Sequence, residues 1–139
     1  MKRWLLIRMA RGGLALGVAA GIVTAPVRAH HSFAVDYLES DTIEIEGDVV
    51  EFQYRNPHAW IFVQGMERGF GGPKVYAAEW VSTSQLERNG IDKRFFKPGD
   101  AVRIWASPNK NPADNRVRLK RMERRSDGWK WAGNRGDVR

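Results

Sequence analysis

The chain has 139 residues, of which 42% are hydrophobic and 28% charged, with no cysteine and a formal net charge of +7. This length and composition allow one folded domain, and the lack of cysteine excludes a disulfide framework and thiol chemistry. A chain this basic often binds nucleic acid or a membrane surface, but the position of the bases weakens that inference here.

Residues 1–29 have the layout of a cleaved secretory signal peptide. A basic start is followed by 14 uncharged residues, Gly12–Ala25, and then by small residues at positions −3 and −1 of a cut after Ala29. The uncharged run is shorter than the roughly 20 residues of a membrane span, and no Arg-Arg pair indicates the twin-arginine route. We therefore expect a periplasmic or secreted protein that begins at His30. Without the leader and its five bases, 18 bases remain against 16 acids, so the mature chain carries only +2.

The first long strand is expected over Thr42–Tyr54. Ile43 and Ile45 alternate with acidic residues, which is the period of a half-buried strand. Past Gly47 the apolar positions shift to Val50, Phe52 and Tyr54. A change of phase beside a glycine predicts a bulge or a sharp bend in this strand.

Two strands and a short helix follow. Residues 55–58 predict a turn, because Asn and Pro favour turns and Pro is excluded from central strands. A second strand is expected over Ala59–Met66 and a third over Lys74–Val81, separated by the glycine-rich loop Arg68–Pro73. A hydroxyl residue at its start and a glycine at its end predict a helix over Ser82–Gly90.

The last part of the domain adds two strands. Ala101–Ala106 has Val102, Ile104 and Ala106 on its inward face, and after a loop a basic fifth strand is expected over Arg116–Glu123. Three strands, a short helix and two strands, with a bent first strand, are the order of an OB-fold barrel; an open antiparallel sheet or a small sandwich is the alternative. We place this domain at residues 30–132 and expect a disordered tail over residues 133–139.

Charge is divided along the mature chain. Residues 30–80 carry a net −6 and residues 81–139 a net +8, with the densest basic run on the fifth strand. One interpretation is a solvated face of an edge strand. The other is a docking surface for an acidic or lipidic partner, formed by bases and strand aromatics: Trp60, Trp80, Trp105, Arg116, Arg118 and Lys120. The expected compartment and the small net charge of the mature chain argue against nucleic acid as the partner.

The chain has three histidines, His30, His31 and His58. Cleavage after Ala29 gives His30 a free amine, and this amine and its imidazole can chelate one metal ion together. A second imidazole, from His58 or His31, completes a three-nitrogen set that suits copper. The plainer alternative is a mobile terminal pair and a structural turn histidine. We expect no enzymatic activity, because the sequence has no Gly-x-Ser-x-Gly, phosphate-loop or zinc-protease motif.

The sequence resembles a family of small exported bacterial proteins of unknown function. The matching motifs span the mature domain: His30-His31-Ser32-Phe33, Gly47, Asn56-Pro57-His58, Glu79, Leu86-x-Arg88-x-Gly90, Lys97–Asp100 and Asp127-Gly128. The chain departs from the family at Ala106-Ser107-Pro108, where a glycine is expected before the loop. The resemblance implies a periplasmic location and assigns no activity.

Two hypotheses of function remain. In the first, a non-enzymatic exported accessory domain binds copper through His30 and His58, with His31 as a further ligand. In the second, a metal-free interaction module docks its partner through the basic fifth strand.

Overall fold

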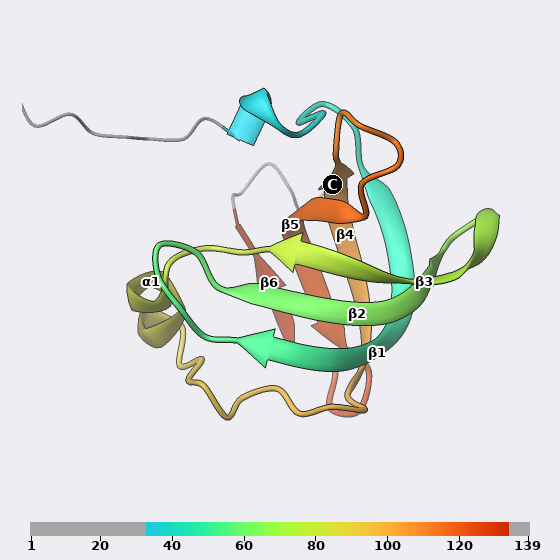
Figure 1. Cartoon of the computed structure of the whole chain (residues 1–139). Coiled ribbons are helices and arrows are strands. Elements are labelled where there is room, and N and C mark those ends of the chain that lie inside the picture. Colours follow the sequence, from blue (N-terminus) through green and yellow to red (C-terminus); the bar gives the residue numbers. More distant parts are fainter. Residues whose placement is uncertain (1–32, 134–139) are drawn as a thin grey trace, which may run out of the picture. The chain divides into compact units, whose positions relative to one another are not determined.

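The computed structural model describes residues 33–133 (Figure 1). The expected leader, the histidines His30 and His31, and residues 134–139 of the expected tail lie outside this range. After a short 3-10 turn, η1, the elements are six strands and one helix: η1 Phe33–Val35, β1 Ile43–Gln53, β2 Trp60–Glu67, β3 Phe70–Glu79, α1 Thr83–Arg88, β4 Ala101–Pro108, β5 Arg116–Arg124 and β6 Lys130–Ala132.

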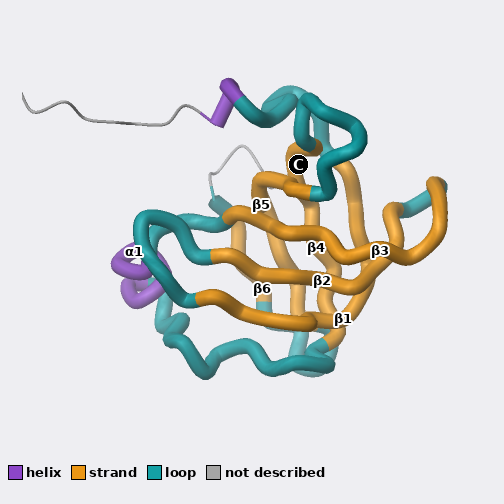
Figure 2. Tube along the Cα trace, in the orientation of Figure 1, coloured by secondary structure: helices purple, strands orange, loops and turns teal. Residues whose placement is uncertain are grey.

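The strands form a closed barrel with one added strand (Figure 2). The sheet order is β3-β2-β1-β4-β5-β6, and a parallel pairing of β3 with β5 closes the first five strands on themselves. β1 pairs with β2 along one part and with β4 along another, as the bent first strand of an OB fold does. The predicted fold class is therefore confirmed, and β6, for which the sequence predicted no strand, extends the sheet beyond β5.

The bend in β1 lies at a bulge two to three residues beyond the expected position. The pairing with β2 shifts register between Val49 and Glu51, which leaves Val50 as the extra residue. Val49 is buried and Val50 is 46% exposed, so the prediction that Val50 faces inward is wrong. The inward set changes phase across the bulge, from Ile45 and Val49 to the partly buried Phe52.

The expected glycine-rich loop is mostly strand. β3 begins at Phe70, and the turn between β2 and β3 is limited to Arg68 and Gly69. Pro73 is accommodated because β3 pairs with β5 only at Ala77–Glu79, so the earlier part of β3 is an edge where a missing N–H donor costs little.

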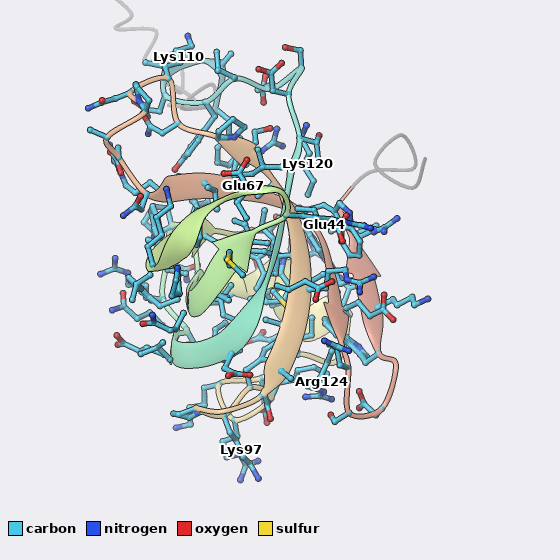
Figure 3. The ribbon with its side chains drawn as sticks, turned by 90° about the vertical axis from the view of Figure 1, so that its right-hand side faces the viewer. Glu44, Glu67, Lys97, Lys110, Lys120 and Arg124 are labelled. Carbon is cyan, nitrogen blue, oxygen red and sulfur yellow. The ribbon has the colours of Figure 1, made fainter. Side chains whose placement is uncertain are left out.

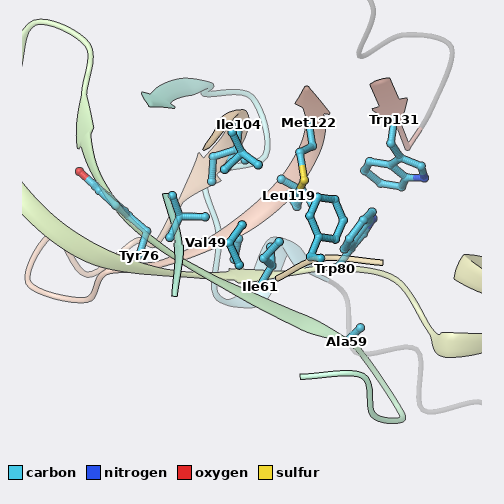
Figure 4. Close-up of a cluster of buried hydrophobic side chains, with 14 of the residues drawn as sticks. Val49, Ala59, Ile61, Tyr76, Trp80, Ile104, Leu119, Met122 and Trp131 are labelled. Carbon is cyan, nitrogen blue, oxygen red and sulfur yellow. The ribbon is translucent and has the colours of Figure 1, made fainter. Parts of the chain in front are cut away.

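The core fills the barrel and extends under α1 and β6 (Figure 4). Ile61 and Val63 of β2, Ile104 of β4 and Met122 of β5 are fully buried within it. The expected inward set of β4 is confirmed, since Val102, Ile104 and Ala106 all have no exposed surface. No helix within residues 33–133 is both long and apolar enough to span a membrane.

Candidate metal-binding site at His58

A segment before the first strand covers the seam between β3 and β5. We call residues 33–42 the N-terminal strap. Its backbone is tied to the end of β4 and to the β4–β5 loop, since Leu38 N donates to Pro108 O at 2.9 Å and Lys110 N donates to Asp36 O at 2.9 Å. These bonds place the side chains of the strap against the outward residues of β3 and β5.

Three side chains from the strap, the β1–β2 turn and β3 form one hydrogen-bonded chain. His58 Nδ1 lies 2.6 Å from Glu79 Oε1, and the Tyr37 hydroxyl donates to Glu79 Oε2 at 2.6 Å. Tyr37 is 2% exposed, and burial together with the Glu79 hydrogen bond raises the pKa of its phenol far above the usual range. Tyr37 therefore remains a neutral donor, and both oxygens of Glu79 are engaged.

The Glu79 contact determines which nitrogen of His58 is free. An ionised carboxylate only accepts hydrogen bonds, so His58 Nδ1 carries the proton and donates it. In the neutral imidazole the lone pair is then on Nε2, for which no protein partner is found within residues 33–133. A histidine that donates one N–H to a carboxylate and presents its other nitrogen is the usual arrangement of a metal-ligating histidine.

The turn that carries His58 is held by α1. This turn contains a cis Asn56–Pro57 peptide bond, and Asn56 Oδ1 accepts hydrogen bonds from the backbone N and the hydroxyl of Thr83 at 3.3 and 2.9 Å. The Tyr54 hydroxyl lies 2.9 Å from Glu87 Oε1 on the same helix. Two residues that precede His58 therefore hold its turn to α1.

Phe33 covers the ring of His58 at the start of the strap. The two rings stack with centroids 5.2 Å apart and planes inclined by 29°. The guanidinium of Arg118 lies 4.2 Å from the Phe33 centroid and also forms an ion pair with Glu39. A cavity of about 190 Å³ adjoins Phe33, Glu79 and Arg118. This cavity is lined by Glu79 and not by His58.

The bases of the fifth strand have partners within the chain. Lys120 (Figure 3) donates from Nζ to Glu39 O, Asp41 O and Thr42 Oγ1 at 2.8 to 2.9 Å, and Arg118 pairs with Glu39. Arg116 pairs with Asp114 at 2.7 Å. These three bases therefore contact the strap and a loop, and their role in docking a partner stays a prediction.

The three tryptophans predicted as a partner surface lie in different places. Trp80 is 1% exposed in the core and packs edge-on against Trp131, so it offers no surface to a partner. Trp105 lies on the outer side of β4 under the guanidinium of Arg121, 3.5 Å from the ring centroid. Trp60 lies on the outer side of β2, half-buried. The structure therefore does not bring these rings together.

Sequence reasoning identified His58 but assigned no role to Glu79, Tyr37 or Phe33. The signal for Glu79 was a single carboxylate in the otherwise largely apolar segment KVYAAEWV. His30 and His31 lie outside the described residues. Within residues 33–133, no group of three or more His, Asp or Glu side chains is placed to hold a metal ion.

Fold and site together define a small OB-fold barrel with a carboxylate-oriented histidine in the turn after its first strand. The chain belongs to a family of unknown function, DUF6152, which matches residues 18–118. No curated protein matches the sequence. Among solved structures it is similar to the mitochondrial single-stranded DNA binding protein Rim1 of S. cerevisiae, with 15% identity, a TM-score of 0.43, and coverage of 61% of this chain and 93% of that one. The OB-fold assignment rests on the strand pairing, independently of this likeness.

Proposed function

We propose that the mature protein is a non-enzymatic periplasmic accessory domain that binds one copper ion through His30 and His58, for storage, delivery or sensing. The observation that carries the proposal is the 2.6 Å contact between His58 Nδ1 and Glu79, which leaves the lone pair of the neutral imidazole on Nε2. The residues fit the metal, because neutral imidazole nitrogen is a good copper ligand and the chain has no thiolate to favour zinc.

The position of Phe33 supports a role for the expected N-terminus. Its ring stacks on His58, and it lies three positions after His30 along the chain. Three residue steps span at most about 10 Å, a length that would allow His30 to reach His58. The amine and imidazole of His30, with Nε2 of His58, supply three nitrogen donors, and His31 is available as a fourth.

Each residue around His58 has a distinct part in this proposal. Glu79 sets the tautomer and orientation of His58, and Tyr37 fixes the second oxygen of Glu79. Phe33 stacks on the imidazole and would limit its rotation. The bound ion would supply the redox-active centre, and the barrel would supply a preformed ligand.

The experiment is a copper titration of the protein that begins at His30, beside a form extended at its terminal amine by an acetyl group. The acetyl group removes the free amine from His30 and leaves the rest of the chain unchanged. We expect one-to-one binding that is lost in the extended form and in His58→Ala. Glu79→Gln, which keeps the shape of the side chain, should weaken binding by about 10–100-fold.

Two results would contradict the proposal. Equal, weak binding by the processed and extended forms would exclude a chelate at the terminus. Unchanged binding by His58→Ala, with circular dichroism showing an intact fold, would exclude the barrel as a source of ligand. Export itself is tested by the mass of the protein recovered from the periplasm, which should correspond to a chain that starts at His30.

A further inference from the structure

The outer sides of β1, β2 and β3 form one continuous face, which is turned toward the viewer in Figure 1. We call it the acidic aromatic face. It consists of three cross-strand rows, defined by the register of the sheet: Gln53–Trp60–Glu79, Glu51–Phe62–Ala77 and Asp48–Gln64–Val75. The first row ends at Glu79, the residue that orients His58, so the face adjoins the candidate site.

The centre of this face is apolar and uncovered within residues 33–133. Trp60 and Phe62 are half-buried, point away from the core and do not belong to the core cluster. Val75 is 41% exposed, and Met66, next along the outer side of β2, is 50% exposed. Neighbouring rings and aliphatic side chains on one exposed strip are typical of an interaction surface, whose centre is enriched in Trp, Phe and Met.

The rim of the face carries unneutralised negative charge. Asp48 and Glu51 are exposed, and no lysine or arginine of residues 33–133 forms an ion pair with either. By contrast, Glu46 of the same strand pairs with Arg103 at 2.6 Å. None of the nine positions in the three rows is basic.

The bases across the β3–β5 pairing do not reverse the charge of the face. Arg116 and Arg118 stand opposite Ala77 and Glu79 across the β3–β5 pairing. Arg116 is neutralised by Asp114 and Arg118 by Glu39. The face therefore attracts cations and repels phosphate-rich partners such as nucleic acids and anionic lipids.

We propose that this face docks a basic peptide segment of a partner protein, in which lysine or arginine alternates with apolar side chains. The apolar side chains of such a segment would pack on Trp60 and Phe62, and its cationic side chains would meet Asp48 and Glu51. A half-buried tryptophan at the centre, with charges at the rim, is the common arrangement of an interface hot spot. This proposal does not rest on copper binding, although a partner docked here would lie beside His58.

The test is calorimetric titration with the peptide acetyl-Lys-Leu-Lys-Leu-Lys-Leu-amide, and with the same sequence carrying Glu in place of Lys. We expect binding of the lysine peptide only, weakened by added salt. Trp60→Ala should reduce the affinity by about tenfold or more. The matched control is Trp105→Ala, which removes a half-buried, outward-facing tryptophan from another part of the sheet and should leave the affinity unchanged.

A double variant, Asp48→Asn with Glu51→Gln, separates charge from shape. This double variant should bind the lysine peptide more weakly, and its binding should no longer depend on salt. Urea denaturation should show that its stability is unchanged. Equal binding of both peptides, or equal losses in the Trp60 and Trp105 variants, would overturn the proposal. Failure of the lysine peptide to bind would also overturn it. A dimer in sedimentation that depends on Trp60, or binding of chitohexaose that depends on Trp60, would overturn it as well, because the face would then bind another partner.

Discussion

Gly47 of β1 stands directly opposite Gly65 of β2, at a crossing where the two backbones nearly touch. A Cβ added at Gly47 would lie 2.2 Å from the carbonyl oxygen of Gln64, and one added at Gly65 would lie 2.4 Å from that of Glu46. Both obstacles are backbone atoms, so a side-chain rotation cannot relieve either clash. The glycine pair allows β1 to remain paired with β2 while it also pairs with β4.

Gly47→Ala is therefore expected to destabilise the barrel. The strands must separate to admit the methyl group, and overpacking of this kind costs about 1–3 kcal/mol. Urea denaturation should show a lower midpoint with an unchanged slope. Gly72→Ala is the control, because a Cβ at Gly72 meets nothing within 4 Å, and it should leave the midpoint in place. Similar shifts in the two variants would show that the crossing imposes no steric constraint.

The importance of Gly47 was visible in the sequence, but its reason was not. The change of phase in β1 suggested that the glycine forms the bulge, whereas the bulge lies at Val50 and the glycine serves a close approach. The residue it approaches, Gly65, is on the next strand, and a pattern within one strand contains no information about the register of its partner.

Lys120→Met is expected to release the N-terminal strap. The ammonium group bonds to two carbonyls and one hydroxyl at the junction of the strap and β1, and methionine keeps the bulk of the stem but none of the donors. Loss of these charge-assisted bonds should lower the free energy of unfolding by about 1.5–3 kcal/mol. Limited proteolysis should cut the strap faster than in the parent protein.

Lys130→Met is the matched control for this experiment. Lys130 is 69% exposed and has only a long ion pair to Glu123, at 3.9 Å. An exposed pair of this kind contributes little, so the control should match the parent protein in both assays. Equal proteolysis of the two variants would mean that Lys120 does not hold the strap.

The same contacts show what the sequence did not reveal about the basic strand. Val117 and Leu119 are buried as the alternation predicted, but the sequence pattern shows a charge on the outer side of a strand without showing what lies above it. The acceptors of Lys120 come from residues 78 to 81 positions earlier in the chain. The pattern of one strand does not show contacts with residues so far away in the sequence.

The candidate site was predicted only in part for a similar reason. His58 was identified from its residue type, but Glu79 and Tyr37 come from positions 21 and 42 residues away from their partners. The antiparallel pairing of β2 with β3 brings the His58 turn close to the end of β3. The strap that brings Tyr37 and Phe33 to them has no regular pattern from which its path could be read.

Arg124→Lys should be destabilising although it keeps the charge. The guanidinium donates to both oxygens of Asp127, at 3.1 and 2.8 Å, and to Phe95 O at 2.8 Å, and it lies 4.6 Å from the Phe95 ring (Figure 3). An ammonium group cannot reproduce the planar fork or the stacking. We expect a loss of about 1.5–3 kcal/mol in urea denaturation. Arg125→Lys, at a 59% exposed side chain, should be neutral, and equal effects at the two positions would refute the assignment.

Tyr37 should make the protein less stable in alkali. Burial and the Glu79 hydrogen bond raise the pKa of its phenol above the ordinary value near 10, so the folded state keeps a proton that the unfolded state loses. Stability is therefore complete below about pH 10 and falls as the pH rises beyond it, because the folded state binds more protons. Urea denaturation at about pH 9 and about pH 11 should show this fall, and Tyr37→Phe should reduce it. Tyr54 and Tyr76 also have raised pKa values, so some dependence should remain in the variant. An equal fall in the parent and the variant would show that Tyr37 does not keep its proton on folding.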